Sequence, residues 1–393
     1  MDNINNINYF NNIIKLINEN DGYIHPNIER KQVNGIYGIY AIKDIKKDEI
    51  IFKIPTKLMI NEKIIKHSDN VNNIVKQQLD LVNDNMNDFK YKYNNIIYIY
   101  NFILEKYKKN ESIYKDMFKL YPTLEKLKEN NIIFYKDYEN IDNNSIIYKY
   151  IIDKKEKLNT VIKIIKNINI MINEDDIIFA TLIYNNYSWS NGYIPFADLF
   201  NHNTEASSHT NDSINNILIN YKDINEGEQI YITYGNDKSI IELALHYNFF
   251  NINNLNNVYL SMQLKSSNPF DFQKAKLLNN MGWTISIDKM NDIFAISNKI
   301  YIYKNTKIYD ETNNLLKILS SDNEYELNNT NKIKYFNYLK HICKLDNDLL
   351  QYKIDNIKLP ENYTYILNAF NERLNIIQEN IDYCNRELQK LIL

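Results

Sequence analysis

The chain has 393 residues, 44% of them hydrophobic and 13% aromatic, so it is long enough for two or three domains with a sizeable core. Its formal net charge of −3 argues against a protein that coats nucleic acid. The N-terminus lacks a signal pattern and no window approaches about 20 apolar residues, so we expect an intracellular protein, cytoplasmic or nuclear, that does not bind membranes. Two cysteines are too few for a structural zinc site and fit a reducing compartment.

Residues 1–61 begin with a predicted helix and continue with predicted strands. Isoleucines, Tyr9 and Phe10 recur at helical spacing within residues 1–20. Gly35 and Gly38 bracket a predicted tight turn, Ala41–Ile45 alternates, residues 46–49 form a polar turn, and Ile50–Ile54 is an apolar run that stops at Pro55. This pattern predicts two short antiparallel strands.

Residues 62–185 are predicted to be helical. Apolar stripes at spacings of three and four occur at residues 71–82 and 158–168, and the mostly apolar segment Ile96–Leu104 ends at Glu105. A glutamate at such a place usually faces solvent. Residues 175–189 open with two aspartates, which are typical of a helix start, and end at Trp189.

A single carboxylate, Asp198, stands within the apolar run Ile194–Phe200, which ends on Asn201 and His202. Amide and imidazole groups at the edge of a core are typical of a small polar site. A lone histidine is more often a satisfied or surface group, and the remaining histidines have no ligand spacing, so we predict no metal site.

Two alternating segments follow, Ile217–Tyr221 and Gln229–Thr233, separated by a Glu-Gly turn signal. They predict a hairpin. Tyr234 then stands at the end of the second strand, where a tyrosine by itself is most often a packing residue.

Beyond residue 250 the sequence predicts a strand at Val258–Leu264, a helix at Phe270–Leu278 that ends near Gly282, and further alternation at Ile293–Tyr303. From Tyr363 an unbroken spacing of three and four predicts one long helix. No repeat of 20 to 50 residues is present.

Three segments in order, PFADLFNH (195–202), GEQIYITYG (227–235) and ELALHYNFF (242–250), resemble the SET domain of the Rubisco large-subunit methyltransferase branch of protein methyltransferases. GIYGIYAIKDI resembles the opening of that domain. The resemblance implies an α+β fold: a β-rich SET domain with a pseudoknot, split by a helical insert and followed by a mainly helical domain. It divides the chain into a SET domain at 1–250 (helix and strands 1–61, insert 62–185, C-terminal half 186–250) and a substrate-binding-like domain at 251–393.

The family binds S-adenosylmethionine (AdoMet), and the resemblance assigns residues to it. Tyr234 is the expected catalytic tyrosine. The matching order FILE, Ser112 and LYP places Glu105 beside the adenosine. The expected cofactor-binding set is Gly38, Tyr40, Glu105, Asn186, Asn201, His202, Tyr234, Tyr247 and Phe249, and the expected substrate-binding set is Trp189, Asp198, Ile232 and Tyr247. Relatives often carry arginines where Tyr40 and Tyr187 stand, so two expected contacts with the cofactor's carboxylate are missing.

Methyl transfer from a sulfonium to an amine needs a neutral amine in a narrow apolar channel. An apolar ring at Trp189 and space at Ala197 suit the aliphatic stem of lysine, whereas a relative that modifies histidine has Asn and Trp at these positions. The sequence therefore predicts transfer to a lysine of a non-histone protein partner. A protein-histidine methyltransferase, or a degenerate SET protein that serves as a binding scaffold, are the alternatives.

Overall fold

The computed structural model describes residues 2–65, 69–80, 89–143, 145–189, 192–235, 238–250, 257–260, 263–265, 274–276, 278, 285–288, 293–296, 300–303, 316–317, 332–341, 343–344 and 359–392. They belong to two compact units, which we describe separately: Met1–Tyr138 with Lys149–Asn236, and Glu139–Tyr148 with Asp237–Leu393. The domain boundary expected at residue 250 stays a prediction.

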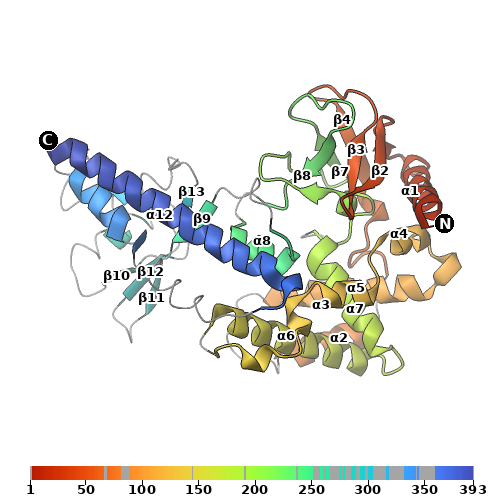
Figure 1. Cartoon of the computed structure of the whole chain (residues 1–393). Helices are drawn as coiled ribbons and strands as arrows, with labels where there is room; N and C mark the ends of the chain where they lie inside the picture. Colours follow the sequence, from red (N-terminus) through yellow and green to blue (C-terminus); the bar gives the residue numbers. More distant parts are fainter. Residues whose placement is uncertain are drawn as a thin grey trace. The chain divides into compact units, whose positions relative to one another are not determined.

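Two four-stranded sheets occupy the first unit, as far as it is described (Figure 1). One has the order β1 (Tyr23–Ile24), β4 (Ile50–Pro55), β7 (Asn215–Ile219) and β6 (Thr210–Asn211). The other has the order β2 (Ile28–Val33), β3 (Ile36–Ala41), β8 (Gln229–Ile232) and β5 (Asn201–His202). All neighbours are antiparallel except β5 and β8, which are parallel.

The two predicted local strand pairs are wrong. The strand expected at Ala41–Ile45 is replaced by β3, which ends at Ala41 and includes Gly38 of the expected tight turn. β3 and β4 lie in different sheets, and so do β7 and β8. Instead β4 pairs with β7 and β3 with β8, across more than 150 residues of sequence. Residues 42–49 and 220–228 each form a corner that leads the chain from one sheet into the other. A two-residue turn would force the two flanking strands to pair with each other, but a connection of this length does not.

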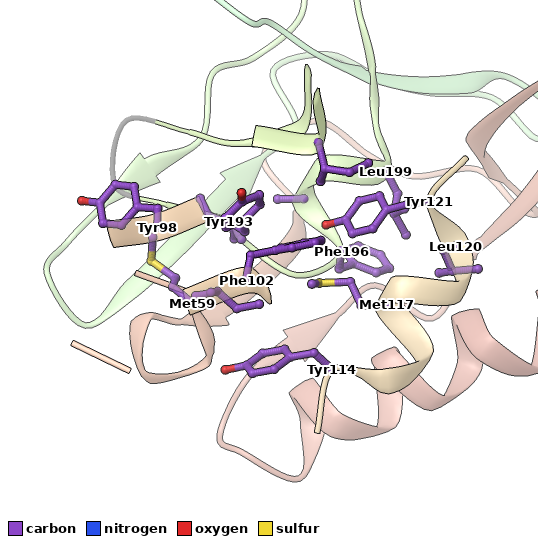
Figure 2. Close-up of a cluster of buried hydrophobic side chains, with 14 of the residues drawn as sticks. Met59, Tyr98, Phe102, Tyr114, Met117, Leu120, Tyr121, Tyr193, Phe196 and Leu199 are labelled. Carbon is purple, nitrogen blue, oxygen red and sulfur yellow. The ribbon is translucent and has the colours of Figure 1, made fainter. Parts of the chain in front are cut away.

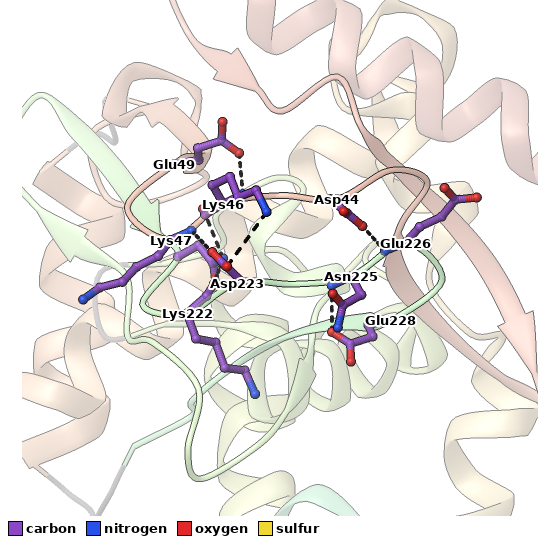
Figure 3. A network of polar contacts seen from close by, with 10 residues as sticks. Asp44, Lys46, Lys47, Glu49, Lys222, Asp223, Asn225, Glu226 and Glu228 are labelled. Atoms are coloured by element: carbon purple, nitrogen blue, oxygen red, sulfur yellow. Dashed lines mark hydrogen bonds and ion pairs between the residues drawn. The ribbon is translucent and has the colours of Figure 1, made fainter.

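These two corners bind each other through matching contacts (Figure 3). Ile45 and Ile224 exchange both backbone hydrogen bonds at 2.9 Å. The carboxylate of Asp44 accepts from the backbone of Glu226, and that of Asp223 accepts from the backbone of Lys47. Each corner therefore satisfies the exposed backbone of the other, in a pseudo-twofold arrangement of the similar sequences KDIKKDE and KDINEGE.

Helices pack around the sheets. The predicted N-terminal helix is α1 (Asp2–Asn18), and the predicted insert is helical from α2 onward. The insert comprises α2 (Asp69–Asp80), α3 (Phe89–Tyr107), η2 (Lys109–Glu111), α4 (Lys115–Leu120), α5 (Leu124–Glu129), η3 (Ile132–Phe134), η4 (Tyr138–Asn140), α6 (Ile146–Ile168) and α7 (Glu174–Tyr187), and a short η1 (Thr56–Leu58) precedes it. Asn173 caps α7 by accepting from the backbone of Asp175, and three acidic residues fill its first turn, which confirms the predicted start.

The core beside the insert is aromatic (Figure 2). Phe102 of α3 is fully buried, and its ring centroid lies 4.7 Å from that of Tyr193 and 6.0 Å from that of Tyr121. Offset and edge contacts of this kind add stability beyond the area they bury. They fix α3 against the segment that leads to Asn201.

Phe196 is the strained residue of that segment. Its φ of +74° lies in the left-handed region, which a bulky side chain rarely adopts. Its fully buried ring stacks on Phe10 at 5.5 Å and contacts Phe52 and Phe200 at 6.3 and 5.6 Å. This packing holds the turn that begins η5 (Ala197–Leu199), directly before Asn201.

The second unit contains helices and short strands. α8 (Ile240–Tyr247) begins with a capping box between Ser239 and Glu242. β10 (Gln263–Lys265), β12 (Ile293–Ile296) and β11 (Ile285–Asp288) form one sheet, and β13 (Ile300–Tyr303) pairs with β9 (Asn257–Leu260). After η8 (Glu361–Tyr363), the predicted long helix is α12 (Thr364–Ile392), which packs on α8. The predicted helix end near Gly282 lies outside the described residues.

None of the described helices has the length and apolar character needed to cross a membrane.

We expect Phe196→Ala to lower the free energy of unfolding by about 3–5 kcal/mol, because it removes a buried ring from a close-packed cluster. Urea unfolding monitored by circular dichroism measures the change. Ile214→Ala, at a side chain that is 69% exposed, is the control and should change stability by less than about 0.5 kcal/mol. Equal losses in the two variants would contradict the anchoring role of Phe196.

Candidate functional site

The parallel pair β5–β8 brings Tyr234 to Asn201 and His202. His202 lies opposite Ile232 in the register, and two residues later the backbone N–H of Tyr234 donates to Nδ1 of His202 at 3.0 Å. The two rings stack with centroids 5.0 Å apart. The hydroxyl of Tyr234 donates to the carbonyl of Phe200 at 2.9 Å. The hydroxyl proton is directed at this carbonyl, and a phenol oxygen can act as an acceptor as well as a donor.

Asn201 connects this corner to β3. Its Nδ2 donates to the carbonyl of Tyr37 at 2.9 Å. A Cβ at Gly38 would lie 2.3 Å from Nε2 of Gln229 and 3.1 Å from Nδ2 of Asn201, so only glycine leaves room for both amides. The hydroxyl of Tyr40 donates to the other end of Gln229 at 3.1 Å. The predicted residues Gly38, Tyr40 and Asn201 therefore meet around one glutamine that the sequence reasoning did not single out.

Arg30 and Tyr37 lie on the opposite face of this sheet from Gly38 and Tyr40. Lys31 is directly opposite Gly38 in the register and its ammonium lies over the Tyr40 ring at 4.6 Å. Since side chains alternate along strands, the neighbouring Arg30 and Tyr37 share the other face. There the guanidinium lies 4.1 Å from the centroid of the Tyr37 ring, a cation–π contact.

Asp198 belongs to the same cluster as Arg30. The carboxylate is buried, and its Oδ2 accepts a hydrogen bond from the hydroxyl of Tyr121 (Tyr121 is shown in Figure 2). Burial raises the pKa of Asp198 to about 7, although the Tyr121 hydrogen bond and the charge of Arg30 lower it. The pKa of the neighbouring Tyr187 is raised to about 12, mainly by burial and also by Asp198.

The predicted residues Glu105 of α3 and Asn186 of α7 have different surroundings. Glu105 is buried, and its oxygens accept from Ser112 at 3.0 Å and from Lys108. Donors of the protein therefore satisfy this carboxylate. Glu105 is buried, although a glutamate at the end of an apolar segment usually faces solvent. Asn186, near the end of α7, has a buried Oδ1 that has no donor within the part of the chain described here.

Trp189, predicted to bind the substrate, lies beside Tyr234. Their ring centroids are 6.2 Å apart in an edge-to-face arrangement. Trp189 also contacts His209, with ring centroids 4.4 Å apart, and burial lowers the pKa of this histidine. Ile232 is fully buried in β8. The sequence reasoning passed over His209 because it considered only metal-ligand spacing.

Tyr247 ends α8 and Phe249 follows it, so both predicted residues belong to the second unit. Asn248 between them adopts a left-handed conformation with φ of +60°, which ends the helix.

A cavity lies between β7 and β8, and Gln229 is one of the residues that line it. This cavity has a volume of about 250 Å³ and is bounded by residues of both strands, the second corner and residues 203–207. None of the predicted site residues faces it. Among the described residues, no three histidine, cysteine, aspartate or glutamate side chains gather as metal ligands would.

The family described as SET domain matches residues 36–235, just over half of the 393-residue chain. The chain belongs to the SET-domain family. The match includes both corners, the helical insert, Asn201 and Tyr234. No curated protein is similar enough in sequence to count as a match.

Solved structures with a similar fold include the SET domain of LSMT bound to lysine and AdoHcy, with a TM-score of 0.58 and 16% identity over 98% of this chain and 92% of that one. Rubisco LSMT bound to AdoMet has a TM-score of 0.57 and 17% identity over 98% and 93%. Rubisco LSMT bound to sinefungin and monomethyllysine has a TM-score of 0.57 and 18% identity over the same shares. The predicted α+β fold of the Rubisco methyltransferase branch is therefore confirmed.

We expect the buried Asp198 to make this SET protein less stable as the pH rises. Its folded pKa of about 7 lies above the unfolded value near 3.9, so between these values the native state holds a proton that the unfolded chain has lost. Its contribution to the free energy of unfolding should fall through this window by an amount on the order of a few kcal/mol.

Urea unfolding of the wild type and Asp198→Asn at pH 5, 6, 7 and 8 measures this effect. The variant should lose less stability between pH 5 and pH 8 than the wild type. Asp137→Asn, at an exposed carboxylate, is the control and should follow the wild type. Parallel pH curves for the wild type and Asp198→Asn would refute the burial argument.

Proposed function

We propose that the chain is an AdoMet-dependent protein-lysine N-methyltransferase that acts on a non-histone protein. The observation that carries this proposal is the position of Tyr234, whose hydroxyl and backbone bind Phe200 and His202 at the start of β5. Membership of the SET family supports it, as do structural neighbours bound to AdoMet, AdoHcy, lysine and methyllysine.

The residues of the first unit fit a cofactor with polar and charged ends. Asn201 and the backbone of His202, both in β5, are proposed to contact the cofactor. Gly38 of β3 and Glu105 of α3 are further proposed contacts. Buried polar atoms that have no protein partner among the described residues, such as Oδ1 of Asn186, suit a bound polar molecule. Tyr40, Tyr247 and Phe249 complete the proposed cofactor set.

Bound AdoMet supplies a methyl group on a positively charged sulfur. The protein's part is orientation and exclusion of water. The hydroxyl of Tyr234 donates to Phe200, which orients the phenol oxygen as an acceptor of weak C–H···O contacts from the polarised methyl group. Trp189 and the buried Ile232 supply apolar walls, which favour the neutral lysine amine over the ammonium. Neutralising a lysine with a pKa of about 10.4 costs roughly 4–5 kcal/mol at pH 7, and alignment can offset this cost.

We expect Tyr234→Phe to lower turnover by about fivefold to about a hundredfold. The lower limit corresponds to the loss of one weak C–H···O contact, and the upper limit to the loss of a preorganised dipole in a site without water. AdoMet affinity should change little, because the lost hydroxyl faces the methyl group. Methyl incorporation from labelled AdoMet into host-cell extract, with mass spectrometry of the modified residue, measures the rate. A normal rate would remove Tyr234 from the mechanism.

Calorimetric titration of the wild type with AdoMet separates this proposal from a scaffold role. Binding is expected for an enzyme. No binding would leave the degenerate scaffold, which the tyrosines at positions 40 and 187 favour.

Trp189→Asn should lower kcat/KM on lysine roughly tenfold or more, because it replaces an apolar wall by a polar amide that needs a partner. Trp189→Phe, which keeps an aromatic face beside Tyr234, is the matched control and should retain most of the activity. Unchanged kinetics in Trp189→Asn, or modification of histidine instead of lysine in the extract, would contradict the assignment of the acceptor.

A further inference from the structure

Three segments that are separate in the sequence bring three rings together in the first unit. The ring centroid of Trp189 lies 6.2 Å from that of Tyr234 and 4.4 Å from that of His209. The corresponding interplanar angles are 81° and 77°. The function proposed above assigns roles to Tyr234 and Trp189 and none to His209. A titratable side chain therefore contacts a proposed apolar wall for the acceptor lysine.

The backbone of Trp189 is fixed by a short bridge. Its N–H donates to the carbonyl of Gly192 at 2.9 Å, and its carbonyl accepts from the N–H of Gly192 at 3.0 Å. The following residue, Tyr193, exchanges two backbone hydrogen bonds with Ile60. Gly192 has a φ of +117°, and a Cβ there would lie 2.4 Å from the carbonyl oxygen of Ile60, so this close approach needs glycine. These bonds hold the backbone, whereas the place of the indole ring depends on the side chains that pack against it.

The segment that carries His209 is held on both sides of this residue. The carbonyl of Ser207 accepts from the N–H of Thr233 at 3.1 Å, which connects the segment to the residue before Tyr234. Directly after His209, β6 pairs with β7. His209 therefore stands between two backbone anchors, which hold its ring beside the indole.

The surroundings of His209 favour the neutral imidazole. Nδ1 is buried and has no hydrogen-bond partner in the described chain. An imidazolium carries an N–H on both nitrogens, so protonation would leave a buried, charged donor without an acceptor. Burial lowers the pKa of His209 and is the cause of the shift among the described residues. The acidic residues nearest to it in the sequence, Glu205 and Asp212, are exposed. The titratable groups on the Tyr234 side of the indole are Tyr234 and His202, which stack on each other.

We propose that His209 is a positioning residue of the acceptor site: its neutral imidazole holds the indole of Trp189 beside Tyr234, and its protonated form does not. This inference rests on the proposed function, in which Trp189 is an apolar wall for the acceptor lysine. An imidazolium must reach water or an acceptor, so it must leave its place against the indole. The acceptor site therefore loses this wall as the pH falls through the pKa of His209, in addition to the loss of rate that protonation of the lysine causes.

Tryptophan fluorescence tests the contact without any substrate. The emission of Trp189 depends on the charge and the distance of the neighbouring imidazole, so the fluorescence of the full chain should change in one transition as the pH is lowered from 8. The midpoint should lie below about pH 6.5, the ordinary pKa of a histidine. His209→Phe keeps an aromatic ring but cannot take up a proton, so it should lack the transition. The difference between the two chains removes the contribution of Trp283, the other tryptophan.

A neighbouring carboxylate provides the matched control. Glu205→Gln, at an exposed position of the same segment, should leave the midpoint within about 0.3 pH of the wild type, because solvent screens an exposed charge. If His209→Phe does not fold, Trp189→Phe replaces it and should also lack the transition. A midpoint above about pH 6.5, no transition down to about pH 4.5, or a transition that persists in either variant would overturn the proposal.

Methyl incorporation from labelled AdoMet into host-cell extract provides a second, independent measurement. At pH 8 His209→Ala, which removes the support of the indole, should lower the rate about fivefold or more, whereas His209→Phe should keep at least about half of it. Calorimetry should find the AdoMet affinity of both variants within about twofold of the wild type, because the change concerns the acceptor. At one pH unit below the fluorescence midpoint, the wild type should be at least about threefold slower than His209→Phe, because most of its His209 is then protonated.

The outcomes separate the two proposals. Equal rates of His209→Ala and His209→Phe at pH 8, or a ratio of wild type to His209→Phe that does not change with pH, would overturn the positioning role alone. A chain that transfers no methyl group overturns the proposed function instead. The fluorescence titration then still decides whether the neutral form of His209 holds Trp189 in place.

Discussion

The parallel pairing of β5 with β8 is the constraint on which the site depends. It comprises two residues on each strand, yet it sets Asn201 and His202 beside the end of β8 and so determines where Tyr234 lies. Such a short pair contributes little by itself. Tyr234 is held further by its hydrogen bonds to Phe200 and His202. Its ring also stacks on that of His202. Backbone pairing and aromatic stacking thus fix one phenol from two directions.

Stability and function share the same strained segment. Phe196 adopts a positive φ, and its ring packs against three other aromatic rings. The residues that follow it include Asp198 and Asn201. A strained backbone persists only where the surroundings over-determine it. The cluster of phenylalanines around residue 196 is therefore a structural support for the polar residues that follow, rather than a separate core.

Buried polar atoms without a partner lie on both faces of β3. On one face the hydroxyl of Tyr40 donates to Oε1 of Gln229, but Nε2 of Gln229, close to Gly38, has no hydrogen-bond partner among the described residues. On the other face, the same holds for Nε of the half-buried Arg30 and for Oδ1 of the buried Asp198. A protein interior tolerates such atoms only at a cost.

The sequence by itself determined the helices α1, α7 and α12 and the existence of most strands, because burial of one face leaves a periodic pattern. It also singled out Asn201, Trp189 and Tyr234, because the motifs that contain them stand in a fixed order. Only the tertiary structure decided which strands pair, so both predicted local pairs were wrong: alternation reports that a strand has a buried face and carries no information about its partner. The same holds for Arg30 and His209. Each is an isolated polar residue in the sequence. Arg30 lies beside Tyr37 because β2 pairs with β3, and His209 lies beside Trp189 because the chain between them folds back.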